Sequence, residues 1–249
     1  AIYGCKNKNI EEQKKSSSGG IFSLFANYIL DNNGVVCGAA YNEKWEVIHK
    51  FIDKKDDLDN LRRSKYVQSN INNTYTQARK FLKGNKLVLF CGTPCQIAGL
   101  KNFLNEDYEN LYTMDFICFG VPSPNVWKIF LKQNFDINNI NLINFRYKEF
   151  GWDNFYLKIQ TRSKNNLLNL CKNFHNTLKK HLIKLLNIQY FFSRYYYLSF
   201  FKGFLQSLFL RPSCHTCIFK GVQRCSDITV YDLWGVKDIA PELYDINGI

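Results

Sequence analysis

The pattern of apolar and polar residues along the chain predicts a mixture of helices and strands. The stretch "SSSGGIFSLFANYIL" (16–30) predicts a Ser/Gly loop that opens a helix, and "GVVCGAAYNEKWEVIHKFI" (34–52) predicts two strands around a turn at 42–44. A polar stretch at 56–84 has helical character and ends at Gly84. The first third of the chain therefore predicts helices on either side of a strand pair.

Residues 86–133 alternate between strand and helix patterns. The pattern predicts strand, helix, strand and helix in turn, at 86–91, 95–104, 112–118 and 125–133. This β-α-β-α unit favours parallel pairing, with functional groups at the carboxyl ends of the strands. The segment "INFRYKEFGWDNFYLKIQTR" (143–162) predicts further strands. We expect an α/β fold in one domain, 1–249, with a parallel β-α-β core, additional strands and a basic helical segment.

One stretch, "YFFSRYYYLSFFKGFLQSLFL" (190–210), is long enough to cross a membrane. Arg194 and Lys202 interrupt it, and tyrosine and serine dilute its apolar character. The sequence therefore predicts a buried, aromatic-rich helix here and no membrane span. The first residues of the chain lack the apolar core of a secretion signal, so we expect a cytoplasmic protein.

The positive charge of the chain is concentrated in one segment. The net charge is +12, and residues 154–226 contain twelve Lys and Arg residues but no Asp or Glu. Such a segment favours an anionic neighbour, either a cofactor or an acidic partner, although a solvated basic face is the simpler interpretation of 164–184. No zinc-finger, helix-turn-helix or RNA-binding signature accompanies the charge, so nucleic acid is not expected as a partner.

The chain has nine cysteines, and several of them cluster. Cys91 and Cys95 flank Gly-Thr-Pro, Cys118 ends the next predicted strand, and Cys214 and Cys217 form a CxxC pair that Cys225 follows. An odd number of cysteines without a secretion signal disfavours a disulfide framework. Zinc sites, redox pairs and iron–sulfur ligands all use CxxC, so spacing alone leaves the three open.

Six segments carry a resemblance to a known family. They are "SSSGGIFS", "SKYVQS", "FCGTPCQIAGLK", "DFICFGVPSP", "NFRYKEFGW" and "RPSCHTCIFKGVQRCSDITVYDLWG". In this order they resemble the coenzyme F420 hydrogenase/dehydrogenase beta-subunit family. The resemblance covers about 1–162 and 187–249 and leaves a divergent insertion at about 163–186. It is closest to bacterial-type members, and the ferredoxin-like domain that many members carry ahead of this region is not in the chain.

The resemblance implies a flavin-dependent oxidoreductase that holds FAD and one [4Fe–4S] cluster. Electrons would pass between ferredoxin-type clusters, in a domain or a separate electron-transfer protein, and a deazaflavin or another two-electron acceptor. The cysteines at the family's recurrent positions, which the resemblance implies as cluster ligands, are Cys95, Cys118, Cys214 and Cys217. It does not identify a catalytic residue.

The residues themselves indicate where the anionic parts of FAD bind. Small residues let the backbone approach a phosphate, and a helix N-terminus favours negative charge. The loop Ser17, Ser18, Gly19 and Gly20 is the first candidate for a phosphate cradle, and Gly92 with Thr93 is the second; a plain capped helix start is the competing interpretation of the first. Further expected flavin or anion contacts are Lys65, Tyr66, Gln68, Arg146 and Lys148.

A different class of function is also compatible with these residues. A zinc ion held by the cysteines could staple a non-enzymatic module, whose basic segment would then dock an acidic partner. Colour separates the two hypotheses, since an iron–sulfur flavoprotein is yellow-brown and a zinc module is colourless.

Overall fold

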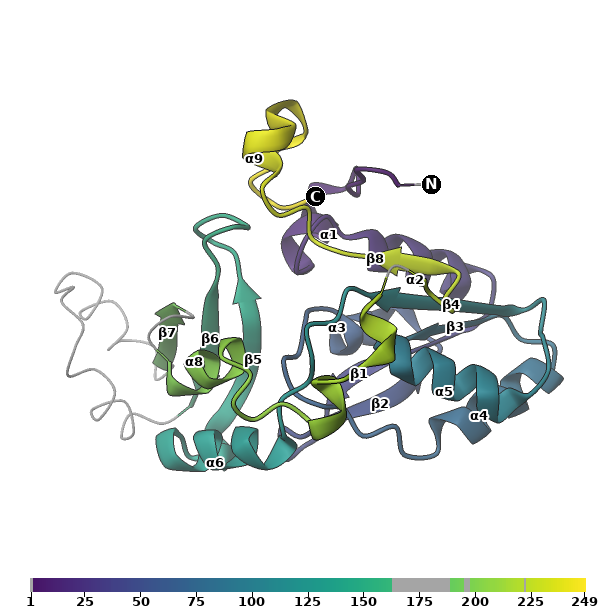
Figure 1. The fold of residues 1–249 in the computed structure, drawn as a ribbon, viewed down its shortest axis with the longest axis horizontal. Helices are drawn as coiled ribbons and strands as arrows, with labels where there is room; N and C mark the ends of the chain where they lie inside the picture. Colours follow the sequence, from purple (N-terminus) through teal and green to yellow (C-terminus); the bar gives the residue numbers. More distant parts are fainter. Residues whose placement is uncertain (1, 163–188, 195–197, 222) are drawn as a thin grey trace, which may run out of the picture.

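The structure is a computed structural model, which describes residues 2–162, 189–194, 198–221 and 223–249. Its larger sheet has the strand order β2-β1-β3-β4-β8 (Figure 1). Strand β1 (Val35–Tyr41) runs antiparallel to β2 (Val47–Ile52). The next three strands, β3 (Val88–Cys91), β4 (Leu111–Phe116) and β8 (Ile228–Val230), are parallel to β1. The predicted α/β class and the parallel β-α-β core are confirmed.

Apolar residues on both faces of this sheet explain why helices cover it on two sides. On β1, Val36 and Ala40 face α2 (Ile21–Asp31) and α3 (Leu58–Leu61). Val35 and Cys37 face the other way, toward α4 (Thr74–Lys83) and α5 (Pro94–Leu104). This alternation with a period of two residues buries both faces, as expected for a mostly parallel sheet. The short 3-10 helix η1 (Lys55–Asp57) precedes α3.

The second sheet is antiparallel, with the order β5-β6-β7. Its strands are β5 (Ile140–Tyr147), β6 (Tyr156–Thr161) and β7 (Gln189–Arg194); α6 (Pro124–Asn134) and the 3-10 helix η2 (Ile137–Asn139) precede β5, and α8 (Ser199–Leu205) follows β7. Helices α6 and α8 pack on this sheet through an aromatic core, which includes Trp127, Phe130, Phe145, Phe200 and Phe201. Aromatic side chains fill this core because each contributes a large apolar area.

Two sequence predictions of helix are wrong in part. The stretch 190–210 begins as strand β7 and becomes helical only at α8, because its first aromatic residues pair with β6 and Phe191 enters the sheet core. The stretch 56–84 is interrupted: residues 62–73 are irregular and separate α3 from α4. The basic helical segment expected within the insertion at 163–186 lies outside the described residues. Among the described residues, no helix has both the length and the apolar character to cross a membrane.

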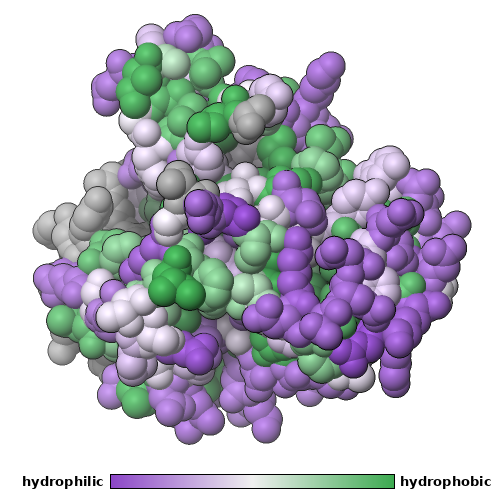
Figure 2. Space-filling view, turned by 45° about the vertical axis from the view of Figure 1, so that its right-hand side comes forward, coloured by the Kyte–Doolittle hydropathy of each residue, from purple (hydrophilic) through white to green (hydrophobic). Residues whose placement is uncertain are grey.

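The C-terminal part of the chain returns to the N-terminal part (Figure 1). After the 3-10 helices η5 (Pro212–Cys214) and η6 (Ile218–Lys220), strand β8 completes the larger sheet, followed by α9 (Val236–Ile239) and η7 (Pro241–Leu243). Ser18 Oγ, just after α1 (Ile10–Lys15), donates a 2.8 Å hydrogen bond to the carbonyl of Ile249. In the space-filling view, apolar surface gathers at the top, over the region of α9 (Figure 2). The two ends of the chain therefore form one packed region.

Candidate functional site

Four cysteines from three distant segments line one pocket of about 900 Å³. Cys95 is in the first turn of α5, Cys118 follows β4, and Cys214 and Cys217 lie in and just after η5. The β1–β2 turn at 44–46, the start of β2 and helix α6 form other walls of this cavity, which we call the cysteine pocket. The α/β topology brings these segments together because the carboxyl ends of β3 and β4 are neighbours in the sheet.

The loop that carries Cys95 is held by side-chain hydrogen bonds. Thr93 N–H donates to Gln96 Oε1 at 2.9 Å, an arrangement that caps the start of α5, and Thr93 Oγ1 lies 3.1 Å from Cys95 Sγ. Gln96 in turn donates to Ser69 Oγ at 2.9 Å. These bonds fix the direction in which α5 presents its first turn. The Cys95 thiol is therefore positioned by a rigid helix start.

The segments that carry the other thiols are tied to each other. Arg211 N–H donates to the carbonyl of Val121 at 3.0 Å, which joins the loop after Cys118 to the segment before Cys214. Gly120 lies between them with φ +144°, and a Cβ atom there would be 2.8 Å from Leu210 Cδ1 and 3.4 Å from Cys214 Cβ. The φ of +144° favours glycine, so another residue would be strained at this position.

The thiols of the pocket influence one another electrostatically. Burial raises the pKa of Cys118 to about 11, and negative charge on the thiols of Cys95, Cys214 and Cys217 contributes to the rise. Four thiolates so placed repel one another unless a positively charged centre lies between them. Cys91 differs, because it ends β3, packs in the apolar core under α2, and has its pKa raised by burial alone.

A buried histidine lies behind the Cys95 loop. His49 Nε2 is 2.9 Å from the carbonyl of Cys91, and its ring stacks on Phe90. Burial lowers the pKa of His49 to about 4, so the ring is neutral and Nε2 carries the hydrogen that it donates to the carbonyl. His49 carries no signal in the sequence, because only the fold brings β2 beside this loop.

The four thiols of the cysteine pocket are a donor set that a zinc ion and an iron–sulfur cluster both use. No group of three or more His, Cys, Asp or Glu side chains within the described ranges is arranged to hold a metal ion. One tetrahedral zinc ion needs its donors packed tightly around it, whereas the larger iron–sulfur cage accepts four thiolates that stand further apart. Four thiols around one cavity are the complete donor set of such a cluster.

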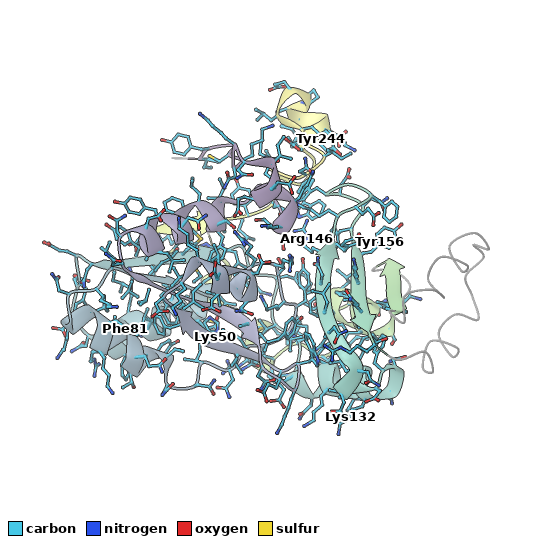
Figure 3. The ribbon with its side chains drawn as sticks, turned by 180° about the vertical axis from the view of Figure 1, so that it is seen from behind. Lys50, Phe81, Lys132, Arg146, Tyr156 and Tyr244 are labelled. Atoms are coloured by element: carbon cyan, nitrogen blue, oxygen red, sulfur yellow. The ribbon has the colours of Figure 1, made fainter. Side chains whose placement is uncertain are left out.

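A second polar region lies where β5 faces the N-terminal segment, and Figure 3 shows Arg146 there. We call it the cation layer; it consists of Arg63, Lys65, Arg146 and Lys148. Lys148 Nζ donates to three carbonyls, those of Gln13, Ser18 and Asn247. Ser17 Oγ accepts hydrogen bonds from Ser64 N–H and Oγ at 2.8 and 3.1 Å, which links the Ser/Gly loop to the segment of Lys65.

Arg146 is the most unusual member of this layer, because it is a buried cation with unused donors. One of its terminal nitrogens pairs with Asp232, and its guanidinium lies over the rings of Phe155 and Trp234 at 4.4 and 5.4 Å. Nε and Nη2 are buried and have no hydrogen-bond partner in the described part of the chain. A buried guanidinium with two unmet donors calls for an acceptor, and an anionic oxygen satisfies it best.

The two lysines of the layer are held in positions that disfavour their charge. Burial lowers the pKa of Lys65 to about 7, and the positive charge of Arg63 adds to the shift. Burial also lowers the pKa of Lys148 to about 8, with a further contribution from Arg146. Repulsion therefore acts within two pairs, Lys65 with Arg63 and Lys148 with Arg146, and the carboxylates of Asp232 and Asp245 partly offset it at Lys148. A further anion beside either pair would favour the charged lysine.

The residues expected to contact a cofactor fall into three groups. Gln68 and Thr93 line the cysteine pocket. Lys148 binds the carbonyl of Ser18 and lies near Arg146, and Ser17 accepts hydrogen bonds from Ser64. Lys65, the next residue, donates to the carbonyls of Leu61, Arg62 and Arg63. The others contact the protein itself: Tyr66 packs on Phe145 and Phe204, Gly92 N–H donates to the carbonyl of Met114, and Gly19 and Gly20 lie against the N-terminal segment. Gly20 has φ +82° and starts α2. Arg63 was not predicted as a cofactor contact, because a single charged residue without a motif carries no signal in the sequence.

Fold and site together define a class: an α/β protein with a thiol-lined pocket at the carboxyl ends of parallel strands. The family model for the C-terminal part of the beta chain of coenzyme F420 hydrogenase/dehydrogenase matches residues 85–243, more than half of this chain. The chain belongs to this family, whose described members are components of oxidoreductases. The expected resemblance is confirmed.

Solved structures give a second comparison. The chain is similar to one in a structure titled "Xenon derivatization of the F420-reducing [NiFe] hydrogenase complex from Methanosarcina barkeri", with a TM-score of 0.50 and 12% sequence identity. The match covers 85% of this chain and 63% of that one, so this chain spans less than two thirds of its neighbour. At this identity the likeness shows the fold. Among curated proteins, no relative matches.

Proposed function

We propose that this chain is an oxidoreductase module that holds FAD and one [4Fe–4S] cluster and passes electrons between ferredoxin-type clusters and a two-electron acceptor. The observation that carries the proposal is the meeting of four thiols around one pocket, from segments far apart in sequence. Four cysteine thiolates are the ligand set of a [4Fe–4S] cluster. Cys95, Cys118, Cys214 and Cys217 are the proposed ligands.

The cation layer and the Ser/Gly loop are the proposed site for the pyrophosphate of FAD. Arg146 offers two buried donors without partners among the described residues, and Lys65 and Lys148 add positive charge. The segment that follows Arg63 connects this layer to the thiols, because Ser64 contacts the Ser/Gly loop and Gln68 lines the cysteine pocket. FAD is a long dinucleotide, and if it lay along this segment it would extend from the cation layer to the thiols.

The chain's own residues would bind and orient the cofactors. FAD supplies the conversion between one-electron and two-electron chemistry when bound. At the cysteine pocket, Gln68 and Thr93 offer polar groups beside the thiols, and neutral His49 holds the loop of Cys95. At the cation layer, Arg146 and Lys148 fix the anionic end. Preorganised positions of this kind reduce the rearrangement that electron transfer requires.

The partners follow from this arrangement. We propose a ferredoxin-type domain or electron-transfer protein as the one-electron partner. A deazaflavin or another two-electron carrier is the proposed second partner, since the similar structure comes from a complex titled F420-reducing. We propose that the described segments and the insertion at 163–186 belong to one functional domain.

The direct test is the composition of the protein purified without oxygen. We expect a yellow-brown protein with about four iron and four sulfide per chain, and one FAD. Iron, sulfide and flavin analysis together with the visible spectrum measure this. A colourless protein that contains zinc and no flavin would support the stapled binding module instead.

A further inference from the structure

One edge of the larger sheet is open. Strand β8 is hydrogen-bonded to β4 on one side and has no neighbouring strand on the other among the described residues, and Figure 1 shows it at the upper edge of the sheet. Ile117 N–H donates to the carbonyl of Val230 at 3.4 Å, so the backbone of Val230 faces β4 and that of Thr229 points to the open side. Lys, Pro and bulges keep other strands from pairing with an edge, and β8 has none of them.

Exposed aromatic side chains lie beside this open edge. Tyr112 and Phe116 of β4 are 40% and 43% exposed, and they share the sheet face of buried Met114, which packs with α2. Phe25 of α2 packs against the same apolar cluster as β8, and Tyr28, one turn further along the helix, is 60% exposed. We call β8 together with Tyr28, Tyr112 and Phe116 the sheet-edge surface.

The segments that form the sheet-edge surface contain no basic residue. They are 16–30, 111–119 and 226–234, and none of them holds a Lys or Arg, although the chain has a net charge of +12. The centres of protein interfaces are depleted of Lys and enriched in Tyr and Phe. Two copies of so basic a chain repel each other, and they repel least where positive charge is missing. The sheet-edge surface therefore suits contact with a second copy of this chain.

We propose that two copies of the chain form a symmetric dimer through the sheet-edge surface, with their β8 strands paired antiparallel. A twofold axis at Thr229 places this residue opposite its equivalent in the second copy, and the two residues then exchange N–H···O=C bonds in both directions. The pairing joins two five-stranded sheets into one and leaves neither β8 with an open side. A second copy supplies this match without any other sequence. The inference does not depend on the proposed cofactors.

The expected dimer is weak. Strand β8 is three residues long, so few backbone bonds form and the apolar side chains must supply most of the binding energy. The exposed parts of the three aromatic side chains amount to roughly 300 Å², against about 800 Å² per partner in a stable complex. Ile117 and Tyr231, just beyond the strand ends, are also exposed and would add to the contact. We therefore expect a Kd on the order of 10 μM.

Sedimentation velocity of the intact chain, purified without oxygen, measures the dimer at concentrations from about 1 to about 100 μM. The mass should rise with concentration toward twice the 29.3 kDa of one chain. Tyr112→Lys should raise the Kd of the dimer at least about tenfold, because it removes apolar area and adds a charge to each copy, and Tyr28→Lys should raise it several-fold. Ile129→Lys is the matched control, since it makes the same kind of change at an exposed position of α6, and it should leave the Kd within about twofold.

Hydrogen exchange tests the backbone pairing itself. In the wild type, the amide of Thr229 should exchange more slowly at high protein concentration than at low concentration, and in Tyr112→Lys it should exchange at one rate. A dimer in which this amide gains no protection would refute the strand pairing. Melting temperatures show that each variant is folded, and iron and FAD contents are measured on the same samples.

The remaining outcomes decide between this surface and its alternatives. A wild type that stays monomeric over the whole range refutes the inference, whatever its cofactor content. A dimer that Ile239→Lys dissociates and Tyr112→Lys does not also refutes it, because the copies would then meet at the apolar surface over α9. A dimer without iron or FAD would support this inference while the proposed function fails.

Discussion

The cysteine pocket and the cation layer are built in opposite ways. The thiols lie on helix starts and short loops near the surface, and in the proposed function they bond to one group. The cation layer includes Arg146 of strand β5. Its guanidinium is buried and has donors without partners among the described residues. A bonded group depends on every ligand, whereas a bound anion is held by the sum of several charges. Loss of one residue should therefore abolish binding at the first region and only weaken it at the second.

The largest expected effect is the loss of iron from ligand variants. Cys118→Ser and Cys217→Ser should each lose most of the iron, and their melting temperatures should fall, because the cluster would join segments far apart in sequence. Cys95→Ser and Cys214→Ser should behave in the same way. Iron content and thermal unfolding of protein purified without oxygen measure both effects.

Cys91→Ser and Cys37→Ser are the matched controls for this comparison. Both thiols belong to neighbouring strands of the same sheet but pack in apolar cores and not in the pocket. They should keep wild-type iron, and Cys171→Ser, outside the described residues, should as well. Retention of iron by Cys118→Ser together with its loss from Cys91→Ser would contradict the ligand assignment.

The sequence predicted the cysteine pocket better than the cation layer, for a physical reason. Cys95 stands at a helix start and Cys118 at the next strand end of the predicted β-α-β unit, so their spacing indicates that these two lie at the same edge of the sheet. The Cys214 and Cys217 pair came from the family resemblance. The cation layer depends on burial between elements that are far apart in the chain, as Lys148 shows by binding carbonyls of Ser18 and Asn247. Sequence patterns do not report which surface-type charges become buried.

The same limit explains the partial errors in the fold. Strand β7 was predicted as helix because a continuous aromatic run suits either structure, and only its pairing with β6 makes it a strand. The segment 62–73 was predicted as helical from its polarity, yet its backbone enters tertiary bonds such as Gln68 N–H to the carbonyl of Pro122. Tertiary contacts override local preference in both places.

An intermediate effect is expected at the cation layer. Arg146→Met removes the two free donors and the charge, so the Kd for FAD should rise about tenfold or more while the iron content stays at the wild-type value. Arg146→Lys keeps the charge and loses the planar guanidinium, so its Kd for FAD should lie between those of the wild type and of Arg146→Met. Quenching of FAD fluorescence on titration measures the affinity.

The control for Arg146 is an exposed ion pair that contains no member of the cation layer. Lys237 Nζ pairs with Asp153 at 2.7 Å and is exposed, so Lys237→Met should leave FAD affinity and iron unchanged. Arg146→Met also leaves the Asp232 carboxylate without its partner, and thermal unfolding will show how far the fold is weakened. If a folded Arg146→Met variant binds FAD as tightly as the wild type does, the cation layer is not part of the FAD site.

The smallest expected effect is a pH dependence that the cysteine pocket should not share. Lys148 has a pKa of about 8 in the folded chain against an ordinary value of 10.5, because burial disfavours its charge. Between these values the unfolded chain holds a proton that the folded chain lacks, so the stability of the unbound protein should rise with pH across this window.

FAD binding should weaken by a few-fold from pH 7 to pH 9, because the pyrophosphate needs the charged ammonium of Lys148. Lys148→Arg, which stays charged, should flatten this decline, and Lys148→Met should bind weakly at every pH. An unchanged slope in a folded Lys148→Arg variant would assign the pH dependence to another group, with Lys65, whose pKa is about 7, as the next to replace.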